Sequence, residues 1–168
     1  MTTSGVDSAL FRQLLGRFAT GVTVLTTRAA DGHPIGMTAS SVASVSLTPP
    51  LLCVSVDRTH DMHAALLQAE TFAVNILAAD QEAISRRFAA DPPVNRFDGV
   101  GYTETETGLP IVQGVLAHIE CTTQAAHAAG DHTIFVGLVT GGAVSDRRPL
   151  LYYRGGYASL GGGGGGGV

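Results

Sequence analysis

Hydroxyl and small side chains gather in residues 36–46, which read Gly-Met-Thr-Ala-Ser-Ser-Val-Ala-Ser-Val-Ser. Small residues let a flat ligand approach the backbone. Hydroxyl groups and free N–H groups at a bend can bind phosphate oxygens without a lysine. A Ser/Thr-rich turn between two strands would have the same composition. The segment therefore indicates either an ordinary turn or the wall of a site for a flat, anionic ligand.

A second polar stretch, residues 53–60, ends an apolar strand just before a predicted helix. A helix N-terminus offers N–H donors and a positive potential to an anion. The sequence also predicts a structural role, with Thr59 or Asp57 capping the helix. His60 and His63 have the spacing of a metal-binding pair, but no third ligand follows at a recognisable spacing. We therefore predict no metal site.

Two further segments carry groups that can contact a ligand. Residues 127–132, His-Ala-Ala-Gly-Asp-His, join two long apolar segments and have the composition of a turn. Residues 152–157, Tyr-Tyr-Arg-Gly-Gly-Tyr, combine aromatic rings with an arginine. Such rings can stack on a planar ligand and the arginine can pair with an anion, although the packing of an edge strand would also explain them.

The basic residues exclude several chemistries, because all 10 are arginine and none is lysine. A Schiff-base lysine, a lysine general base and a phosphate-binding P-loop lysine are therefore impossible. The chain also lacks G-x-G-x-x-G after a strand, H-E-x-x-H and G-x-S-x-G. Dinucleotide-binding folds, zinc proteases and α/β-hydrolases are disfavoured.

Length and composition favour one domain over residues 1–160, followed by a glycine-rich tail, 161–168, that we predict to be disordered. The net charge of −4 disfavours nucleic-acid binding. Cys53 and Cys121 lie in apolar runs, as buried thiols do in a reducing compartment. No export signal or apolar run long enough for a membrane span is present. We therefore expect a cytoplasmic protein with no membrane or nucleic-acid partner.

The elements that must position these groups begin with a helix capped by Asp7. Its apolar residues form one stripe of an amphipathic helix: Leu10, Phe11, Leu14, Leu15 and Phe18. β-Branched runs at 22–27, 41–47 and 51–56 follow, which we interpret as a β-meander. Two shorter helices are predicted at 61–69 and 80–88, with a strand at 72–77 between them.

The remaining predicted strands are 115–126, 133–144 and 150–153, with a turn through 128–130. Many short strands joined by tight turns, with helices that do not alternate with every strand, favour a closed or nearly closed barrel over a doubly wound sheet. The predicted fold is mainly β: an antiparallel β-barrel with peripheral helices.

In their order along the chain, these segments resemble the short-chain, split-barrel flavin reductases, the reductase components of two-component flavin-dependent monooxygenases. The match spans residues 11–160. It rests on Phe-Ala-Thr-Gly-Val-Thr-Val at 18–24, Gly-Met-Thr-Ala-Ser-Ser at 36–41, Ser-Val-Ser-Leu-Thr-Pro-Pro-Leu at 44–51, Phe-Ala-Val-Asn-Ile-Leu at 72–77, Gly-Asp-His at 130–132 and Pro-Leu-Leu-Tyr-Tyr-Arg-Gly at 149–155.

The resemblance implies a homodimer of split barrels that transfers hydride from NADH or NADPH to FMN or FAD. It also implies that reduced flavin passes to a separate monooxygenase. The direct transfer of hydride between two flat rings needs no nucleophile or strong base, which agrees with the absence of a catalytic triad motif. The alternative is a flavin-binding electron carrier that holds FMN without nicotinamide turnover.

The resemblance also implies a set of site residues. The flavin cradle would comprise Met37, Thr38, Ala39, Ser40, Ser41, Ser55, Val56, Asp57, Thr59 and Asn75, with Arg87 as a candidate phosphate partner. The nicotinamide side would comprise His127, Gly130, Asp131, His132, Tyr153 and Arg154. Of these, His127 and His132 would position the nicotinamide, and which of the two contacts it is left open.

Overall fold

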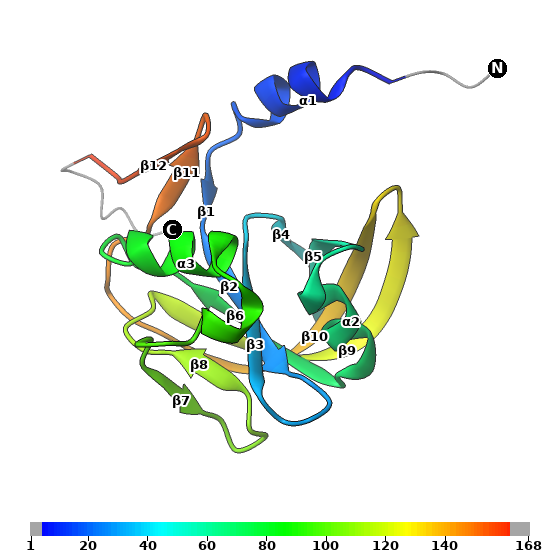
Figure 1. Ribbon diagram of the computed structural model, residues 1–168, viewed down its shortest axis with the longest axis vertical. Helices are drawn as coiled ribbons and strands as arrows, with labels where there is room; N and C mark the ends of the chain where they lie inside the picture. The colour runs from blue at the N-terminus through cyan, green and yellow to red at the C-terminus, as the bar shows by residue number, and fades with distance from the viewer. Residues whose placement is uncertain (1–4, 162–168) are drawn as a thin grey trace.

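A computed structural model describes residues 5–161 of the chain, and the fold is mainly β (Figure 1). Of the predicted glycine-rich tail, residues 162–168 lie outside the described part. The main sheet has seven antiparallel strands in the order β3-β2-β6-β9-β10-β5-β4. These strands are β2 (Thr23–Arg28), β3 (Pro34–Ala39), β4 (Val42–Leu47), β5 (Pro50–Asp57), β6 (Thr71–Ile76), β9 (Ala117–Ala129) and β10 (His132–Val144).

Smaller elements surround this sheet. The helices are α1 (Ser8–Leu15), α2 (Asp61–Gln68), α3 (Glu82–Ala90) and the 3₁₀ turn η1 (Pro93–Asn95); the other strands are β1 (Thr20–Gly21), β7 (Tyr102–Glu104), β8 (Pro110–Val112), β11 (Leu151–Tyr153) and β12 (Gly156–Ala158). All three predicted helices are confirmed, but α1 ends at Leu15, before Phe18 of the predicted stripe, and α3 begins and ends two residues later than predicted. Across residues 5–161, none of the helices combines the length and the apolar character needed to cross a membrane.

The predicted β-meander is wrong, because residues 34–39 form a strand, β3, that the pattern did not indicate. β3 pairs with β2, and β4 pairs with β5, but β3 and β4 do not pair with each other. They are the two edge strands of the sheet, yet only residues 40 and 41 separate them. Since consecutive Cα atoms are about 3.8 Å apart, the sheet must curve until its two edges approach each other at this corner.

The core lies on the concave face of the curved sheet. Burial alternates along β5 and along the first half of β10, as expected for strands with one packed face. Phe72 and Phe135 are fully buried there, and α2 adds Met62 and Leu66. The thiol of Cys121 also lies in this core, where burial raises its pKa to about 12.

Helix α1 differs from α2 and α3 because it buries none of its residues. The predicted cap is confirmed: Asp7 Oδ1 accepts the N–H of Leu10 at 2.8 Å. The apolar stripe nevertheless faces solvent, its five side chains between 44% and 73% exposed. Figure 1 shows α1 standing away from the main sheet, above β1 and the β11–β12 hairpin. The stripe therefore predicted the helix correctly, but no part of residues 5–161 covers it.

Candidate functional site

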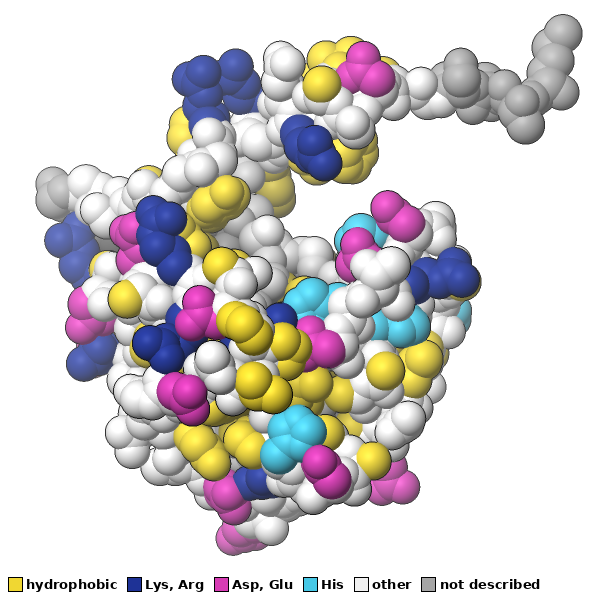
Figure 2. All heavy atoms as spheres, in the orientation of Figure 1, with side chains coloured by type: hydrophobic (Ala, Val, Ile, Leu, Met, Phe, Trp, Pro, Cys, Tyr) yellow, Lys and Arg dark blue, Asp and Glu magenta, His cyan; other side chains and the backbone are white. Residues whose placement is uncertain are grey.

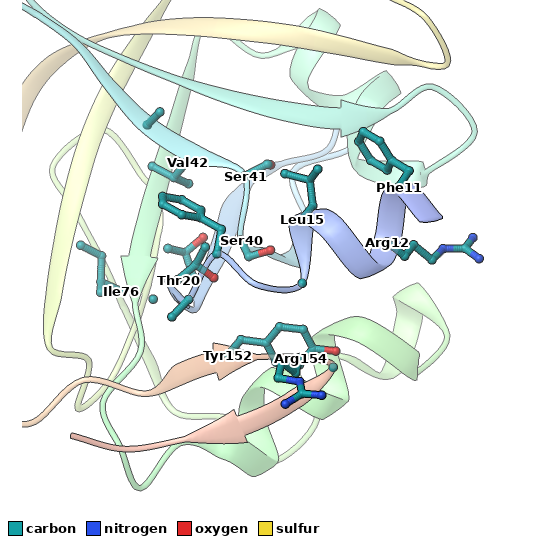
Figure 3. Close-up of a pocket in the computed structure, with 17 residues that line it drawn as sticks. Phe11, Arg12, Leu15, Thr20, Ser40, Ser41, Val42, Ile76, Tyr152 and Arg154 are labelled. Atoms are coloured by element: carbon teal, nitrogen blue, oxygen red, sulfur yellow. The ribbon is translucent and has the colours of Figure 1, made fainter. Parts of the chain in front are cut away.

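A cleft of about 960 Å³ opens between α1, the β11–β12 hairpin and the β3–β4 corner (Figure 3). Its lining combines three kinds of group and contains no carboxylate. The lining residues are Phe11, Arg12, Leu15, Gly16, Phe18, Ala19, Thr20, Gly21, Thr23, Ser40, Ser41, Val42, Ala43, Ile76, Tyr152, Arg154 and Gly155. Apolar side chains, hydroxyl groups and two guanidinium groups suit a ligand with a flat apolar ring and a negative charge.

The two polar segments from the sequence lie side by side at this corner. Ser41 Oγ donates a hydrogen bond to the carbonyl of Ser55 (2.8 Å) and accepts one from the N–H of Ser55 (3.2 Å). Thr23 Oγ1 donates to the carbonyl of Ala39 at 2.7 Å, which fixes the end of β3. Ser40 and Ser41 line the cleft. The link between β3 and β4 is thus both the closing corner of the sheet and a wall of the cleft.

A second group of polar residues lies where β5 ends against the turn between β9 and β10. His132 is paired with Asp57 across the strands. Arg58 fixes the turn, since its N–H donates to the carbonyl of Asp131 (3.0 Å) and its Nη1 to that of Gly130 (3.1 Å). Gly130 has a φ of +63°, which a tight turn requires and glycine adopts readily. We call residues 57–63 with residues 127–132 the histidine end.

The electrostatics of the histidine end come from short contacts among its own residues. Asp57 Oδ1 accepts hydrogen bonds from the N–H and the hydroxyl of Thr59, both at 2.7 Å, and these bonds lower the pKa of Asp57. His132 Nδ1 lies 2.7 Å from Asp131 Oδ1, which orients the imidazole. Figure 2 shows histidine side chains, in cyan, gathered beside the hollow below α1.

The helix cap at this end differs from the prediction. His60 caps α2, because its Nδ1 accepts the N–H of Met62 at 3.1 Å. Neither Asp57 nor Thr59 caps it, since Asp57 instead closes the turn that precedes the helix. Burial lowers the pKa of His60, which keeps the ring neutral and able to accept, although the neighbouring Asp61 opposes this shift.

Several expected flavin residues have partners within the protein. Asn75 is fully buried: Nδ2 donates to the carbonyl of Val24 and to Thr26 Oγ1, both at 3.0 Å, and Oδ1 accepts the N–H of Val112 at 2.9 Å. Arg87 donates to the carbonyl of Asp98, which ties α3 to the loop after η1. Neither residue lines the cleft. Their polar atoms are therefore used to hold the scaffold.

Other expected residues do not line the cleft. Thr38 Oγ1 donates to the carbonyl of Ser85 in α3 at 2.6 Å. Met37 packs against the core, and Val56 is fully buried in it. On β11 the alternation of side chains brings Tyr152 into the cleft, whereas Tyr153 is not part of the lining.

The β11–β12 hairpin that carries Tyr152 is fixed by aromatic and polar contacts. The rings of Tyr152 and Tyr157 are T-shaped with centroids 5.3 Å apart. Tyr157 Oη lies 2.8 Å from Ser85 Oγ, and the Arg86 guanidinium lies 4.8 Å from the Tyr157 ring centroid. The hairpin is therefore anchored to α3, and Tyr152 is held in place through Tyr157.

The sequence reasoning missed the contribution of α1 to the cleft. Phe11, Arg12, Leu15 and Phe18 all line it. An amphipathic stripe is the usual sign of packing against a core, so the pattern gave no reason to place these residues at a ligand site. The available signal was the Phe-Ala-Thr-Gly segment at 18–21, which follows the stripe directly and continues along the cleft.

The curved sheet thus carries at its corner a cleft lined by apolar, hydroxyl and guanidinium groups. Residues 15–161 match the family described as flavin reductase like domain, and the chain belongs to this family. Among residues 5–161, no three His, Cys, Asp or Glu side chains are grouped so that they could hold a metal ion.

Three known proteins illustrate the similarity. The flavin-dependent monooxygenase reductase subunit HsaB of Rhodococcus jostii is 40% identical over 92% of this chain and 79% of its own length. The FMN reductase (NADH) SmoA of Agrobacterium fabrum is 44% identical over 91% of this chain and 86% of its own. The structure of the NADH:FAD oxidoreductase SgcE6 of Streptomyces globisporus, in complex with NAD and FAD fragments, has a TM-score of 0.87 at 38% identity, covering 95% of this chain and 98% of that one.

Proposed function

We propose that this protein is an NAD(P)H:flavin oxidoreductase that transfers hydride from NADH or NADPH to FMN or FAD. Reduced flavin then passes to a separate monooxygenase. The observation that carries the proposal is the cleft, with its apolar walls and guanidinium groups. Its residue Ser41 is bonded to Ser55 of β5, the strand that pairs with His132 at its far end. Similarity to reductases whose names specify NADH favours NADH as the donor.

The chain's own residues bind and orient the two rings. Flavin, when bound, supplies an acceptor for the hydride of the dihydronicotinamide. The apolar side chains of the cleft exclude water from the ring, and the hydroxyl groups of Thr20, Ser40 and Ser41 offer hydrogen bonds at its edge. His132, oriented by Asp131, positions the nicotinamide at the other end of the site. Holding the rings in contact is the main catalytic task of such a protein.

We also propose that the seven-stranded sheet is a split barrel. The support is the two-residue link at 40–41 between the two edge strands, which brings the edges of the sheet together at one end. The edges do not pair along their length, because β3 and β4 have no register with each other. Such a sheet would be closed at the corner and open elsewhere.

The exposed stripe of α1 supports a homodimer. Helix α1 presents four large apolar side chains to solvent and Phe18, just after it, a fifth; Leu47 and Val144 are also 93% and 88% exposed. Apolar patches of this kind usually mark an interface. A second copy of the chain would cover the stripe, and it would then form part of the cleft wall, because Phe11, Leu15 and Phe18 also line the cleft. The reduced thiols Cys53 and Cys121 accord with a cytoplasmic dimer.

The experiment that tests the function follows oxidation of NADH and NADPH through the loss of dihydronicotinamide absorbance, with FMN, FAD or no flavin. We expect turnover that requires flavin and saturates with it. Purified protein that shows no turnover but retains flavin through gel filtration would contradict the reductase and support the electron carrier. A colourless protein whose melting temperature ignores both flavins would contradict both.

A further inference from the structure

The end of the β9–β10 hairpin extends beyond the strand that supports the rest of β9. The register of β9 with β6 ends at Thr122, and in the described part of the chain residues 125–129 pair with β10 alone. Every residue from Ala126 to Asp131 is exposed. Figure 1 shows this end, in yellow, projecting away from α2 and α3. We call residues 126–132 the hairpin tip; burial in the core does not fix it.

Arg58, in the loop after β5, holds the hairpin tip from one side. β5 pairs with β10 as far as Asp57 and His132. Arg58 extends this contact by one residue, because its N–H donates to the carbonyl of Asp131 at 3.0 Å. Its Nη1 also donates to the carbonyl of Gly130, at 3.1 Å. Among the described residues, no other side chain from outside the hairpin forms a hydrogen bond with the hairpin tip.

The two histidines expected to position the nicotinamide share one face of the hairpin tip. His132 is paired with Ala129, and His127 lies two residues before Ala129, so the alternation of side chains along a strand puts all three on the same side. The neighbouring Thr133 points to the opposite side, where it is buried. The histidines therefore lie on the face turned away from the core, and their direction depends on how the tip is held.

The turn itself does not need Arg58 in order to form. Gly130 has a φ of +63° at the first central position of a two-residue loop, and Asp131 has no positive φ. This is the pattern of a type II′ turn, which favours glycine at that position and matches the twist of a hairpin. Arg58 therefore contributes the placement of the turn against β5. Because the Arg58 side chain is exposed, its loss should leave the protein folded.

We propose that Arg58 is a positioning residue for the hydride donor: it holds the hairpin tip so that His132 keeps the orientation in which it contacts the nicotinamide. The inference rests on the proposed function. Hydride transfer needs the donor ring close to its acceptor and aligned with it, so a small displacement of the group that orients the ring weakens productive binding.

The test compares the kinetics of R58M and R58K with those of the wild type. R58M removes the donor to Gly130 and should raise the KM for NADH about fivefold, with the KM for flavin unchanged. R58K keeps an N–H donor and should restore most of the wild-type KM, because Arg58 makes only one side-chain hydrogen bond. A merely structural role would reduce the amount of active protein, which lowers the apparent kcat and changes neither KM.

A double-mutant cycle separates positioning from direct binding of the donor by the guanidinium. If Arg58 acts through His132, R58M should have little further effect on the KM for NADH when it is added to H132A. Effects of R58M and H132A that multiply would overturn the proposal in favour of a direct contact between Arg58 and the donor.

R148M is the matched control. Arg148 is also exposed and also donates to a backbone carbonyl, that of Leu160 at 2.5 Å, so R148M removes the same charge and the same kind of bond away from the hairpin. It should change neither KM.

Hydrogen exchange of the hairpin tip, followed by mass spectrometry, is a readout that does not depend on activity. Exchange should be faster in R58M and equal to that of the wild type in R58K and R148M. Unchanged exchange in R58M would overturn the proposal. A wild type that does not oxidise NADH would contradict the proposed function, whereas an active wild type and an R58M protein with the same KM for NADH would overturn the role of Arg58 alone.

Discussion

The cleft and the histidine end differ in how their polar side chains are held. At the histidine end the polar groups are paired within the protein: Asp57 with Thr59, His132 with Asp131, and His63 Nε2 with the hydroxyl of Thr133 at 2.8 Å. At the cleft, Thr23 and Ser41 are also paired, but Arg12 and Arg154 donate no side-chain hydrogen bond within residues 5–161. The histidine end is held by its own contacts, whereas the cleft keeps two guanidinium groups outside such contacts.

This difference indicates which part of the reaction each region controls. Paired hydrogen bonds keep a side chain in one orientation, which suits the positioning of a ring for hydride transfer. Unpaired charges and exposed rings contribute mainly to affinity, because a ligand gives them the partners that the protein does not. We therefore expect changes at the histidine end to alter turnover and stability, and changes at the cleft to alter binding and assembly.

The largest effect on stability should come from the ion pair that supports the histidine end. Arg96 is almost fully buried; Nη1 donates to Asp61 Oδ1 (3.0 Å) and to the carbonyl of Gly36 (2.9 Å). R96M leaves a partly buried carboxylate without its cation and should lower the free energy of unfolding by about 3 kcal/mol, measured by urea denaturation.

E82Q is the control for R96M. It breaks a solvent-exposed pair with Arg86, leaves the Arg86 guanidinium over the Tyr157 ring, and should cost less than about 1 kcal/mol. Equal losses in the two variants would show that the Arg96 pair does not support the histidine end.

The next largest effect concerns assembly at the cleft side. Leu14 belongs to the exposed stripe of α1 but does not line the cleft. L14D should raise the dissociation constant of the proposed dimer by about a hundredfold, because a charge must then be buried against a second copy. Analytical ultracentrifugation measures the dissociation constant of the dimer. Q13D places the same charge on α1 outside the stripe and should leave the dimer intact; a monomeric wild type would contradict the proposed interface.

A smaller effect is expected where α3 holds the wall of the cleft. Y157F removes the hydroxyl that contacts Ser85 Oγ and should cost about 1 kcal/mol of stability, together with a modest loss of flavin affinity. Thermal melting and fluorescence titration measure the two effects. Y153F, which changes an exposed tyrosine outside the cleft, is the matched control. If both variants behave alike, Tyr157 does not position Tyr152.

The smallest effect is a pH dependence at the histidine end. Because burial lowers the pKa of His60, the unfolded chain takes up a proton at a higher pH than the folded chain. Stability should therefore fall as the pH drops below about 6.5, the ordinary pKa of histidine, and the loss should be complete below the lowered pKa. H60N keeps an acceptor for the N–H of Met62 and should not show this loss. The melting temperatures of the wild type and H60N are measured between pH 7 and pH 4. If both melting temperatures fall equally with pH, His60 does not cause the loss of stability.

The sequence predicted elements whose local pattern agrees with their final environment. Asp7 and the apolar stripe specify α1, and β-branched runs specify β2, β5, β9 and β10. Strand β3 was missed because Pro34 and Gly36 are poor strand formers, and its pairing with β2 overrides that preference. The short β7–β8 pair was missed because three-residue strands carry little pattern.

The candidate site was predictable only in part, because local sequence patterns indicate single segments but not which segments meet. The polar segments around Ser41, Ser55 and the turn at 130–132 could be read from composition, and the structure brings Ser41 to Ser55 and the turn to Asp57. The position of the cleft could not be predicted, because it lies between α1 and the β11–β12 hairpin. These segments are far apart in the sequence, and a local pattern does not indicate such a contact. Thr20 pairs with Tyr152, residues that lie far apart in the sequence.

That pairing has a consequence for biosynthesis. The cleft takes its walls from residues 11–23, from the β3–β4 corner and from Tyr152 to Gly155. A nascent chain therefore has no complete cleft until translation has passed Gly155 and the β11–β12 hairpin has left the ribosome. Contacts between such distant segments also form late in folding, because closing the long intervening loop lowers the conformational entropy of the chain. Uptake of flavin would thus report that synthesis and folding are both finished.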